Sequence, residues 1–174
     1  MTRPIINLDE LELIPMEAMS RQQGGNPPPP RFGGAMAPIS HRLGAQKLGY
    51  NLTVVPPGRR AFPFHSHRVN EELFFVIEGT GQVRIGEQTW PIRAGDVIAC
   101  PPGGAETAHQ IVNTGESTLR YLAVSSNQTP EVCEYPDSGK FAVMHVAGMG
   151  ADGKPQGFRH VGKQADAYDY WEGE

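Results

Sequence analysis

Residues 58–79, GRRAFPFHSHRVNEELFFVIEG, contain two histidines, His65 and His67, separated by one serine. In an extended segment both imidazoles project from the same face, because side chains alternate between the two faces of a strand. Glu72 follows and opens the apolar run LFFVI, which is typical of a buried strand. A later strand-like run, HQIVN, begins with His109. The pattern predicts that separate strands bring these four side chains to one point.

Three imidazoles and one carboxylate form a donor set suited to a single divalent metal ion. Neutral imidazole binds Fe, Mn, Ni, Cu and Zn ions, and the carboxylate favours the harder ones, so the pattern leaves the identity of the metal open. Four protein ligands on an octahedral ion leave two positions for a substrate, whereas a structural zinc site is normally closed. The remaining histidines, His41, His145 and His160, are expected to be surface or hydrogen-bonded residues.

The length and charge of the chain limit its partners. It has 174 residues, 19 acidic and 15 basic, with a formal net charge of -4. One hydrophobic core is expected, and nucleic acid is not, because phosphate backbones require a basic stripe. No apolar run approaches the roughly 20 residues that span a bilayer, and no signal peptide is recognisable. We therefore expect a cytoplasmic protein with a small-molecule ligand and no membrane partner, and with Cys100 and Cys133 reduced.

Three regions differ in composition. Residues 1–34 are rich in proline and glycine and include four consecutive prolines, which predicts an extended arm with a single helical turn at 15–19. Residues 35–146 consist of short β-branched or aromatic runs separated by turn residues, which predicts antiparallel β structure. Residues 147–174 are expected to form a tail that begins with a loop at 147–153.

Nine strands are expected in the central region, each bounded by residues that favour tight turns. Their ranges are 47–55, 62–67, 72–77, 81–85, 88–92, 96–100, 108–113, 118–125 and 141–146. Strands this short and frequent predict a sandwich or a barrel, and no long helix competes with them.

The segment around the histidine pair resembles the first motif of the cupin superfamily: Gly, five residues, His-x-His, three or four residues, Glu, six residues and Gly. The matching residues are Gly58, His65, His67, Glu72 and Gly79. One departure is that six residues, not five, separate the first glycine from the histidine pair. Glu71 also falls within the permitted window, but only Glu72 keeps the motif's distance to Gly79.

A second segment resembles the other cupin motif: Gly, five residues, Pro-x-Gly, two residues, His, three residues and Asn. The matching residues are Gly95, Pro101, Gly103, His109 and Asn113. Five residues rather than two precede the histidine, in a loop expected at the mouth of the barrel. The resemblance covers about residues 52–125. Residues 134–140, EYPDSGK, also resemble a run in some bacterial cupin-like proteins of unassigned activity, and physically they form a turn between strands.

The resemblance implies an all-β, cupin-type double-stranded β-helix, or jelly-roll barrel, with extended N- and C-terminal arms. It also implies a range of functions, since cupins include sugar-phosphate isomerases, dioxygenases, decarboxylases and non-catalytic proteins. Our leading expectation is a metal-dependent enzyme acting on a small polar metabolite with vicinal hydroxyl and carbonyl oxygens, such as a sugar or sugar phosphate undergoing isomerisation. The alternatives are an Fe(II)-dependent dioxygenase, a non-catalytic binding or sensing module, and a sandwich for protein contacts with scattered histidines.

Further polar residues near the expected mouth are candidates for acid–base or anion-binding roles. The candidates for an acid or base group are Glu106, Tyr50 and Tyr121, with a solvated or core role as the alternative for each. The arginines that flank the histidine pair are Arg59, Arg60 and Arg68. These arginines are candidates to receive a phosphate or carboxylate, with a solvent-facing cluster as the alternative.

Open strand edges and the proline-rich arm favour a homodimer in which an arm covers an edge of the partner. Tyr168, Tyr170 and Trp171 add aromatic area to the acidic tail. Such residues are expected to dock on the chain's own barrel or on that of a neighbour.

Overall fold

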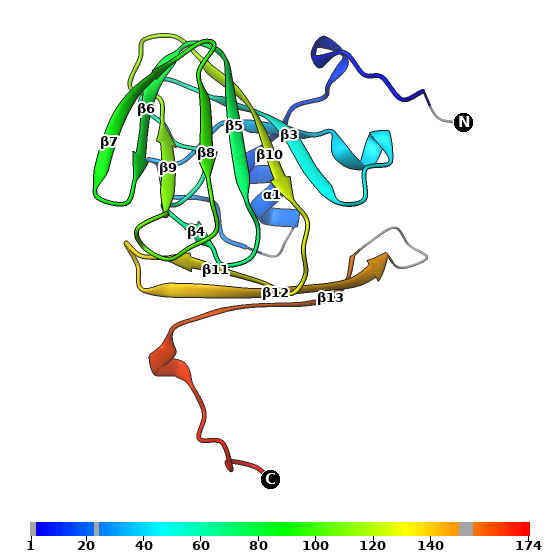
Figure 1. The fold of residues 1–174 in the computed structure, drawn as a ribbon, viewed down its shortest axis with the longest axis vertical. Helices are drawn as coiled ribbons and strands as arrows, with labels where there is room; N and C mark the ends of the chain where they lie inside the picture. Colours follow the sequence, from blue (N-terminus) through cyan, green and yellow to red (C-terminus); the bar gives the residue numbers. More distant parts are fainter. Residues whose placement is uncertain (1–2, 23–24, 150–154) are drawn as a thin grey trace.

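Three antiparallel sheets make up most of the molecule (Figure 1). The computed structural model describes residues 3–22, 25–149 and 155–174. The largest sheet contains, in spatial order, β1 (Ile14–Pro15), β2 (Ala35–Pro38), β3 (Leu48–Val55), β10 (Leu119–Ser126), β5 (Glu72–Glu78) and β8 (Val97–Cys100). The all-β prediction is therefore confirmed.

The other two sheets are smaller. One contains β13 (Pro155–Gly162), β12 (Lys140–Met149), β11 (Glu131–Tyr135) and β4 (Ser66–His67), and its strands β11, β12 and β13 lie below the other two sheets in Figure 1. The other contains β7 (Gln88–Arg93), β6 (Thr80–Ile85) and β9 (His109–Val112). A single-residue bridge between His65 and His109 joins the segment before β4 to β9, and hydrogen bonding does not run continuously around a closed barrel as the resemblance implied.

Short helices accompany the strands. They are η1 (Leu8–Glu10), α1 (Met16–Gln22), η2 (Ser40–Leu43) and η3 (Gln164–Asp166). The predicted turn at 15–19 is thus the start of α1, whose Met16 and Met19 pack against the main core. Among the described residues, no helix is both long and apolar enough to span a membrane.

The main core lies between the six-stranded and three-stranded sheets. It combines Val76 of β5 and Tyr121 of β10 with Val83 of β6, Ile92 of β7 and Ile111 of β9, all almost fully buried. Along β10 alternate residues are buried, as the two-residue period of a strand requires. A smaller cluster of Ala37, Ile39 and Leu52, with Tyr50 packed against it, forms around β2 and β3.

Gly79 shows why the motif requires glycine at the turn between β5 and β6. Its φ is +85°, and a Cβ atom there would lie 2.5 Å from the carbonyl oxygen of Thr118. Both the positive φ and the close approach exclude a larger residue.

Several elements differ from the sequence-based expectations. The expected strand at 62–67 is regular only at Ser66–His67. Pro63 lacks the N–H that strand pairing needs, and the residues around it form bends. Four strands were not predicted, namely β1, β2, β11 and β13. Residues 147–149 were expected to be loop but belong to β12, where Gly148 pairs with Gln156 of β13. The rest of that expected loop, 150–153, lies outside the described residues.

The tail aromatics do not dock on their own sheets. Tyr168, Tyr170 and Trp171 are 83%, 81% and 74% exposed, and the chain beyond β13 runs away from the sheets (Figure 1). Docking on a neighbouring molecule stays a prediction.

Replacement of Asn113 by alanine tests how much its buried hydrogen bonds stabilise the fold. Its Nδ2 donates to the carbonyl oxygens of Val55 and Ser117, both at 2.8 Å, and its Oδ1 accepts from the N–H of Gly115 at 3.0 Å. Asn113→Ala leaves these buried groups unpaired, so we expect the free energy of unfolding, measured in urea, to fall by about 3 kcal/mol. Gln88→Ala, at an exposed strand end, should change it by less than about 0.5 kcal/mol. Similar small losses in both variants would show that the Asn113 hydrogen bonds are dispensable.

Candidate metal centre

A pair of backbone hydrogen bonds brings two sheets together at the candidate site. The N–H of His109 donates to the carbonyl oxygen of His65 at 2.8 Å, and the N–H of His65 donates to that of His109 at 3.2 Å. His67 lies on β4, and Glu72 is the first residue of β5. The four side chains singled out in the sequence therefore come from β4 and the residue before it, β5 and β9.

The side chains converge on one carboxylate oxygen. Oε2 of Glu72 lies 2.8 Å from Nε2 of His109, 3.4 Å from Nε2 of His67 and 3.9 Å from Nε2 of His65. Two ligand atoms that are each about 2.1 Å from one ion lie about 3 Å apart when they subtend a right angle and about 3.4 Å apart at a tetrahedral angle. The observed spacing is close to that of atoms surrounding one small cation.

The potential metal-binding atoms of the four side chains lie close to one another. One donor atom each from His65, His67 and Glu72 all lie within 4.8 Å of one another, and His109 joins this group through Glu72. Nε2 of His67 is buried, and its 3.4 Å contact with Oε2 of Glu72 is longer than a normal hydrogen bond. A buried nitrogen with so weak a contact is unfavourable unless something else binds it. The arrangement thus fits a metal ion.

The opposite ring nitrogens are held by other acceptors. Nδ1 of His65 lies 2.8 Å from the carbonyl oxygen of Pro63, and Nδ1 of His109 lies 3.4 Å from that of Thr107. Nδ1 of His67 lies 3.3 Å from Sγ of Cys133 and 3.5 Å from a carboxylate oxygen of Glu131. Such contacts fix the ring orientation of a histidine ligand and direct its other nitrogen to the centre.

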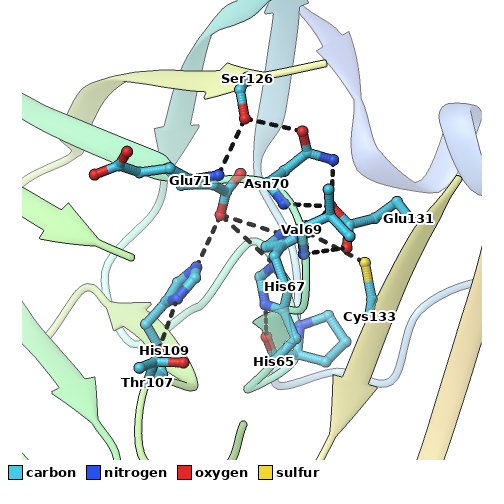
Figure 2. Close-up of polar contacts among 12 residues, drawn as sticks. His65, His67, Val69, Asn70, Glu71, Thr107, His109, Ser126, Glu131 and Cys133 are labelled. Atoms are coloured by element: carbon cyan, nitrogen blue, oxygen red, sulfur yellow. Dashed lines mark hydrogen bonds and ion pairs between the residues drawn. The ribbon is translucent and has the colours of Figure 1, made fainter. Parts of the chain in front are cut away.

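Glu131 holds the loop that connects His67 to Glu72 (Figure 2). It is 4% exposed, and its carboxylate accepts hydrogen bonds from one side-chain amide and several backbone N–H groups. The donors are the N–H groups of Arg68, Val69, Asn70 and Val132, at 2.8 to 3.2 Å, and the side chain of Asn70. Neither Glu131 nor the contact of Cys133 with His67 was predicted, because both residues lie on β11, a strand that was itself not predicted.

Burial and mutual contact shift the ionisation of these groups. Burial, together with the neighbouring His109, lowers the pKa of His65 to about 4 despite the nearby Glu72. Burial would lower the pKa of His67, but hydrogen bonds to Cys133 and Glu72 outweigh it and raise that pKa. Burial would raise the pKa of Glu72, but hydrogen bonds from His109 and His67 hold it well below its usual range. At neutral pH the site therefore contains a carboxylate and at least one neutral imidazole.

The acid and base candidates have other surroundings. Tyr121 is 2% exposed, burial raises its pKa, and its ring packs edge-on against Phe74 at 5.7 Å. Tyr50 packs with the smaller hydrophobic cluster. Glu106 is exposed, and its carboxylate accepts from the N–H of Gly104 at 2.8 Å, which lowers its pKa. In the part of the chain that the structure describes, none of the three hydrogen-bonds to the four candidate ligands.

The flanking arginines separate into different environments. Arg68 binds Oε1 of Glu134 through Nε at 2.9 Å and Nη2 at 2.7 Å. Arg60 donates from Nη1 to Oε1 of Gln110 at 3.3 Å. The carbonyl oxygen of Arg59 accepts from the N–H of Asn113 at 2.9 Å. The structure therefore does not gather the three guanidinium groups into one anion site.

Cys100, which the sequence placed before the loop at the mouth, is 1% exposed and pairs in register with Glu72. Burial raises the pKa of its thiol to about 12, with the charge of Glu72 acting in the same direction. It is a buried, protonated residue behind the site. The thiol that contacts a candidate ligand is that of Cys133.

Part of the chain is similar in sequence to known proteins. Residues 51–125 match the family model described as the Cupin domain. An uncharacterized protein of Methanocaldococcus jannaschii is 31% identical over 85 residues, 47% of this chain and 65% of its own length. An oxalate-binding protein of Thermotoga maritima is 34% identical over 70 residues, 40% of this chain and 54% of its own. The chain thus spans less than two thirds of each of these curated relatives.

The whole fold also has a counterpart among solved structures. A sugar phosphate isomerase from a cupin superfamily, from Silicibacter pomeroyi, superimposes with a TM-score of 0.69 and 21% identity. The match covers 94% of this chain and 95% of that one. At this identity the likeness establishes a shared fold, which confirms the cupin-type architecture predicted from the two motifs.

The shifted pKa of His65 predicts how pH affects the metal-free protein. Between pH 6.5 and pH 4 the unfolded chain binds a proton at His65 that the folded chain excludes, so stability falls as the pH falls. From pH 6.5 to about pH 5 this amounts to roughly 1.5 kcal/mol, because an unfolded histidine is only half protonated at pH 6.5. The raised pKa of His67 adds no slope below about pH 5.5, because both states are protonated there. Urea unfolding after chelation should show the loss in wild type and a smaller one in His65→Gln.

His41→Gln, at an exposed histidine, is the matched control and should keep the wild-type slope. Identical pH dependence in wild type and His65→Gln would contradict the assignment of a buried, neutral His65.

Proposed function

Because residues 51–125 match the family model described as the Cupin domain, we propose that the chain is a metal-dependent enzyme. Its ligands are His65, His67, Glu72 and His109, and its substrate is a small polar metabolite with vicinal hydroxyl and carbonyl oxygens. The observation that carries the proposal is the convergence of three imidazole nitrogens on one oxygen of Glu72, at 2.8 to 3.9 Å.

The donor set matches the proposed cofactor. Three imidazoles and one carboxylate suit Fe, Mn, Zn or Ni ions and leave positions on an octahedral ion for a substrate. When bound, a divalent ion polarises a carbonyl group and stabilises the negative charge that develops on its oxygen. The side chains supply the orientation: Cys133 and Glu131 hold the His67 ring, and Pro63 holds that of His65.

We further propose that the reaction is the isomerisation of a sugar or sugar phosphate. Such a reaction moves a proton between adjacent carbons and needs a polarised carbonyl next to a hydroxyl. The likeness to the sugar phosphate isomerase from Silicibacter pomeroyi supports this choice by analogy of fold. At neutral pH the carboxylate of Glu72 is deprotonated and the ring of His65 is neutral, so both can bind a cation without losing a proton, whereas the raised pKa of His67 means that metal binding displaces its proton.

A second candidate function is the binding of a small dicarboxylate without turnover. The 34% identity over 70 residues to an oxalate-binding protein of Thermotoga maritima favours it. Two adjacent carboxylate oxygens present the same pair of donors as a hydroxyl and a carbonyl, so both ligands fit the same open positions.

Metal analysis tests the ligand set. After chelation and reloading with Mn(II), Fe(II), Ni(II) or Zn(II) in turn, elemental analysis of the wild type should give about one ion per chain for at least one metal. The double variant His65→Ala, His67→Ala should lose it, and His41→Ala should retain it. Cys133→Ser should also retain it, since the alternative trio of His67, Glu131 and Cys133 is not the proposed site. Stoichiometric metal in the double variant, or its loss in Cys133→Ser, would contradict the proposal.

Solvent exchange tests the reaction. The metal-loaded protein is incubated in D2O with a panel of aldoses and aldose phosphates, and NMR follows deuterium at the carbon beside the carbonyl. We expect incorporation with at least one sugar, reduced by about 100-fold or more in Glu72→Gln, which removes the ligand charge. Saturable oxalate binding without exchange on any sugar would favour the binding module. Oxygen uptake by the Fe(II) form without exchange would favour a dioxygenase.

A further inference from the structure

A cleft beside the candidate metal centre is large enough for a metabolite. Its volume is about 550 Å³, within the range of small-molecule sites. One wall comes from the proline-rich segment, including Pro28 and Arg31, and the opposite wall from the turn between β11 and β12, including Lys140. Arg60 lies on the segment between them.

The cleft carries positive charge that the protein does not neutralise. Arg31, Arg60 and Lys140 line it, and the acid among its lining residues, Asp137, is paired with Arg84 at 3.0 Å. Among the described residues, no carboxylate lies within ion-pair distance of those three cations. Three cations around one hollow repel each other unless an anion binds between them. This local excess is notable in a chain whose formal net charge is -4.

Arg60 is held in place by several hydrogen bonds. Its backbone N–H donates to the carbonyl oxygen of Arg31 at 3.3 Å, and its own carbonyl oxygen accepts from the N–H of Gly33 at 3.0 Å. Its Nη1 donates to Oε1 of Gln110, whose Nε2 in turn donates to the carbonyl oxygen of Phe62 at 2.7 Å. Nε of Arg60 is buried without a hydrogen-bond partner. A fixed guanidinium with unused donors is suited to an oxyanion.

The cleft and the metal centre share a wall. Pro63 and Gln110 line the cleft and also a small cavity, about 10 Å³, that touches His65 and His109. Tyr135, on the opposite side of the cleft, stacks on the ring of His65 with centroids 6.2 Å apart. A ligand anchored in the cleft therefore lies next to the candidate ligands.

We propose that this cleft binds the phosphate group of a phosphorylated small metabolite. Three cations without a carboxylate partner match a phosphate dianion better than a single carboxylate, and the arginines supply forked donors for its oxygens. The inference deepens the proposed function, because it selects sugar phosphates over unphosphorylated sugars. Anion binding by the cleft does not itself depend on a metal.

Calorimetric titration with inorganic phosphate tests the site in the full chain after chelation, at an ionic strength fixed with sodium chloride. We expect saturable binding that weakens by about tenfold or more in Arg60→Gln and in the double variant Arg31→Gln, Lys140→Gln. Arg42→Gln, an exposed arginine outside the cleft, should bind as the wild type does. Arg60→Lys keeps the charge without the fork and should be intermediate. Urea unfolding of each variant confirms that it is folded.

Three results would overturn the inference: no saturation in the wild type, equal weakening in Arg42→Gln, or full affinity in the double variant of Arg31 and Lys140. A parallel titration with a phosphate monoester separates a metabolite site from one that accepts only free phosphate, and exclusion of the monoester also contradicts the proposal. Phosphate binding without metal binding would refute the proposed function but leave the cleft intact, and metal-dependent exchange without phosphate binding would do the reverse.

Discussion

The backbone pairing of His65 with His109 is the contact on which the site depends. Its two hydrogen bonds, 2.8 and 3.2 Å long, join the segment before β4 to the start of β9, in sheets that are otherwise separate. Without these two hydrogen bonds, no backbone contact would hold His65 next to His109. Because the hydrogen bonds are between backbone groups, the side chains are free to face the carboxylate of Glu72.

A buried carboxylate extends this constraint around the site. Glu131 ties the loop between His67 and Glu72 to β11 through hydrogen bonds from backbone N–H groups, and it also lies 3.5 Å from Nδ1 of His67. A desolvated acid is stable here because its oxygens are saturated with donors. The same side chain thus shapes the backbone and orients a candidate ligand. Glu72 supplies the carboxylate that faces the imidazoles, and Glu131 positions the loop and the ring of His67.

Much of the fold could be predicted from local sequence. The His-x-His pair, Glu72 and His109 identified the cupin-type architecture, and short apolar runs bounded by turn residues identified β5 and β10. β13 was missed because PQGFRHVG is polar and contains glycine, and its pairing depends on β12, not on its own pattern. Glu131 was missed for a related reason: its donors are more than sixty residues away, except for its neighbour Val132. The regularity of 62–67 was overestimated because the aromatic residues on either side of Pro63 favour a strand, although the proline removes a donor that strand pairing needs.

Anomalous diffraction from crystals of the metal-loaded protein, collected at the absorption edge of the metal, tests the central claim most directly. We expect one strong peak per chain, about 2.0 to 2.3 Å from Nε2 of His65, His67 and His109 and from the carboxylate of Glu72. A peak among His67, Glu131 and Cys133 instead, or a His109 ring turned away from the ion, would contradict it.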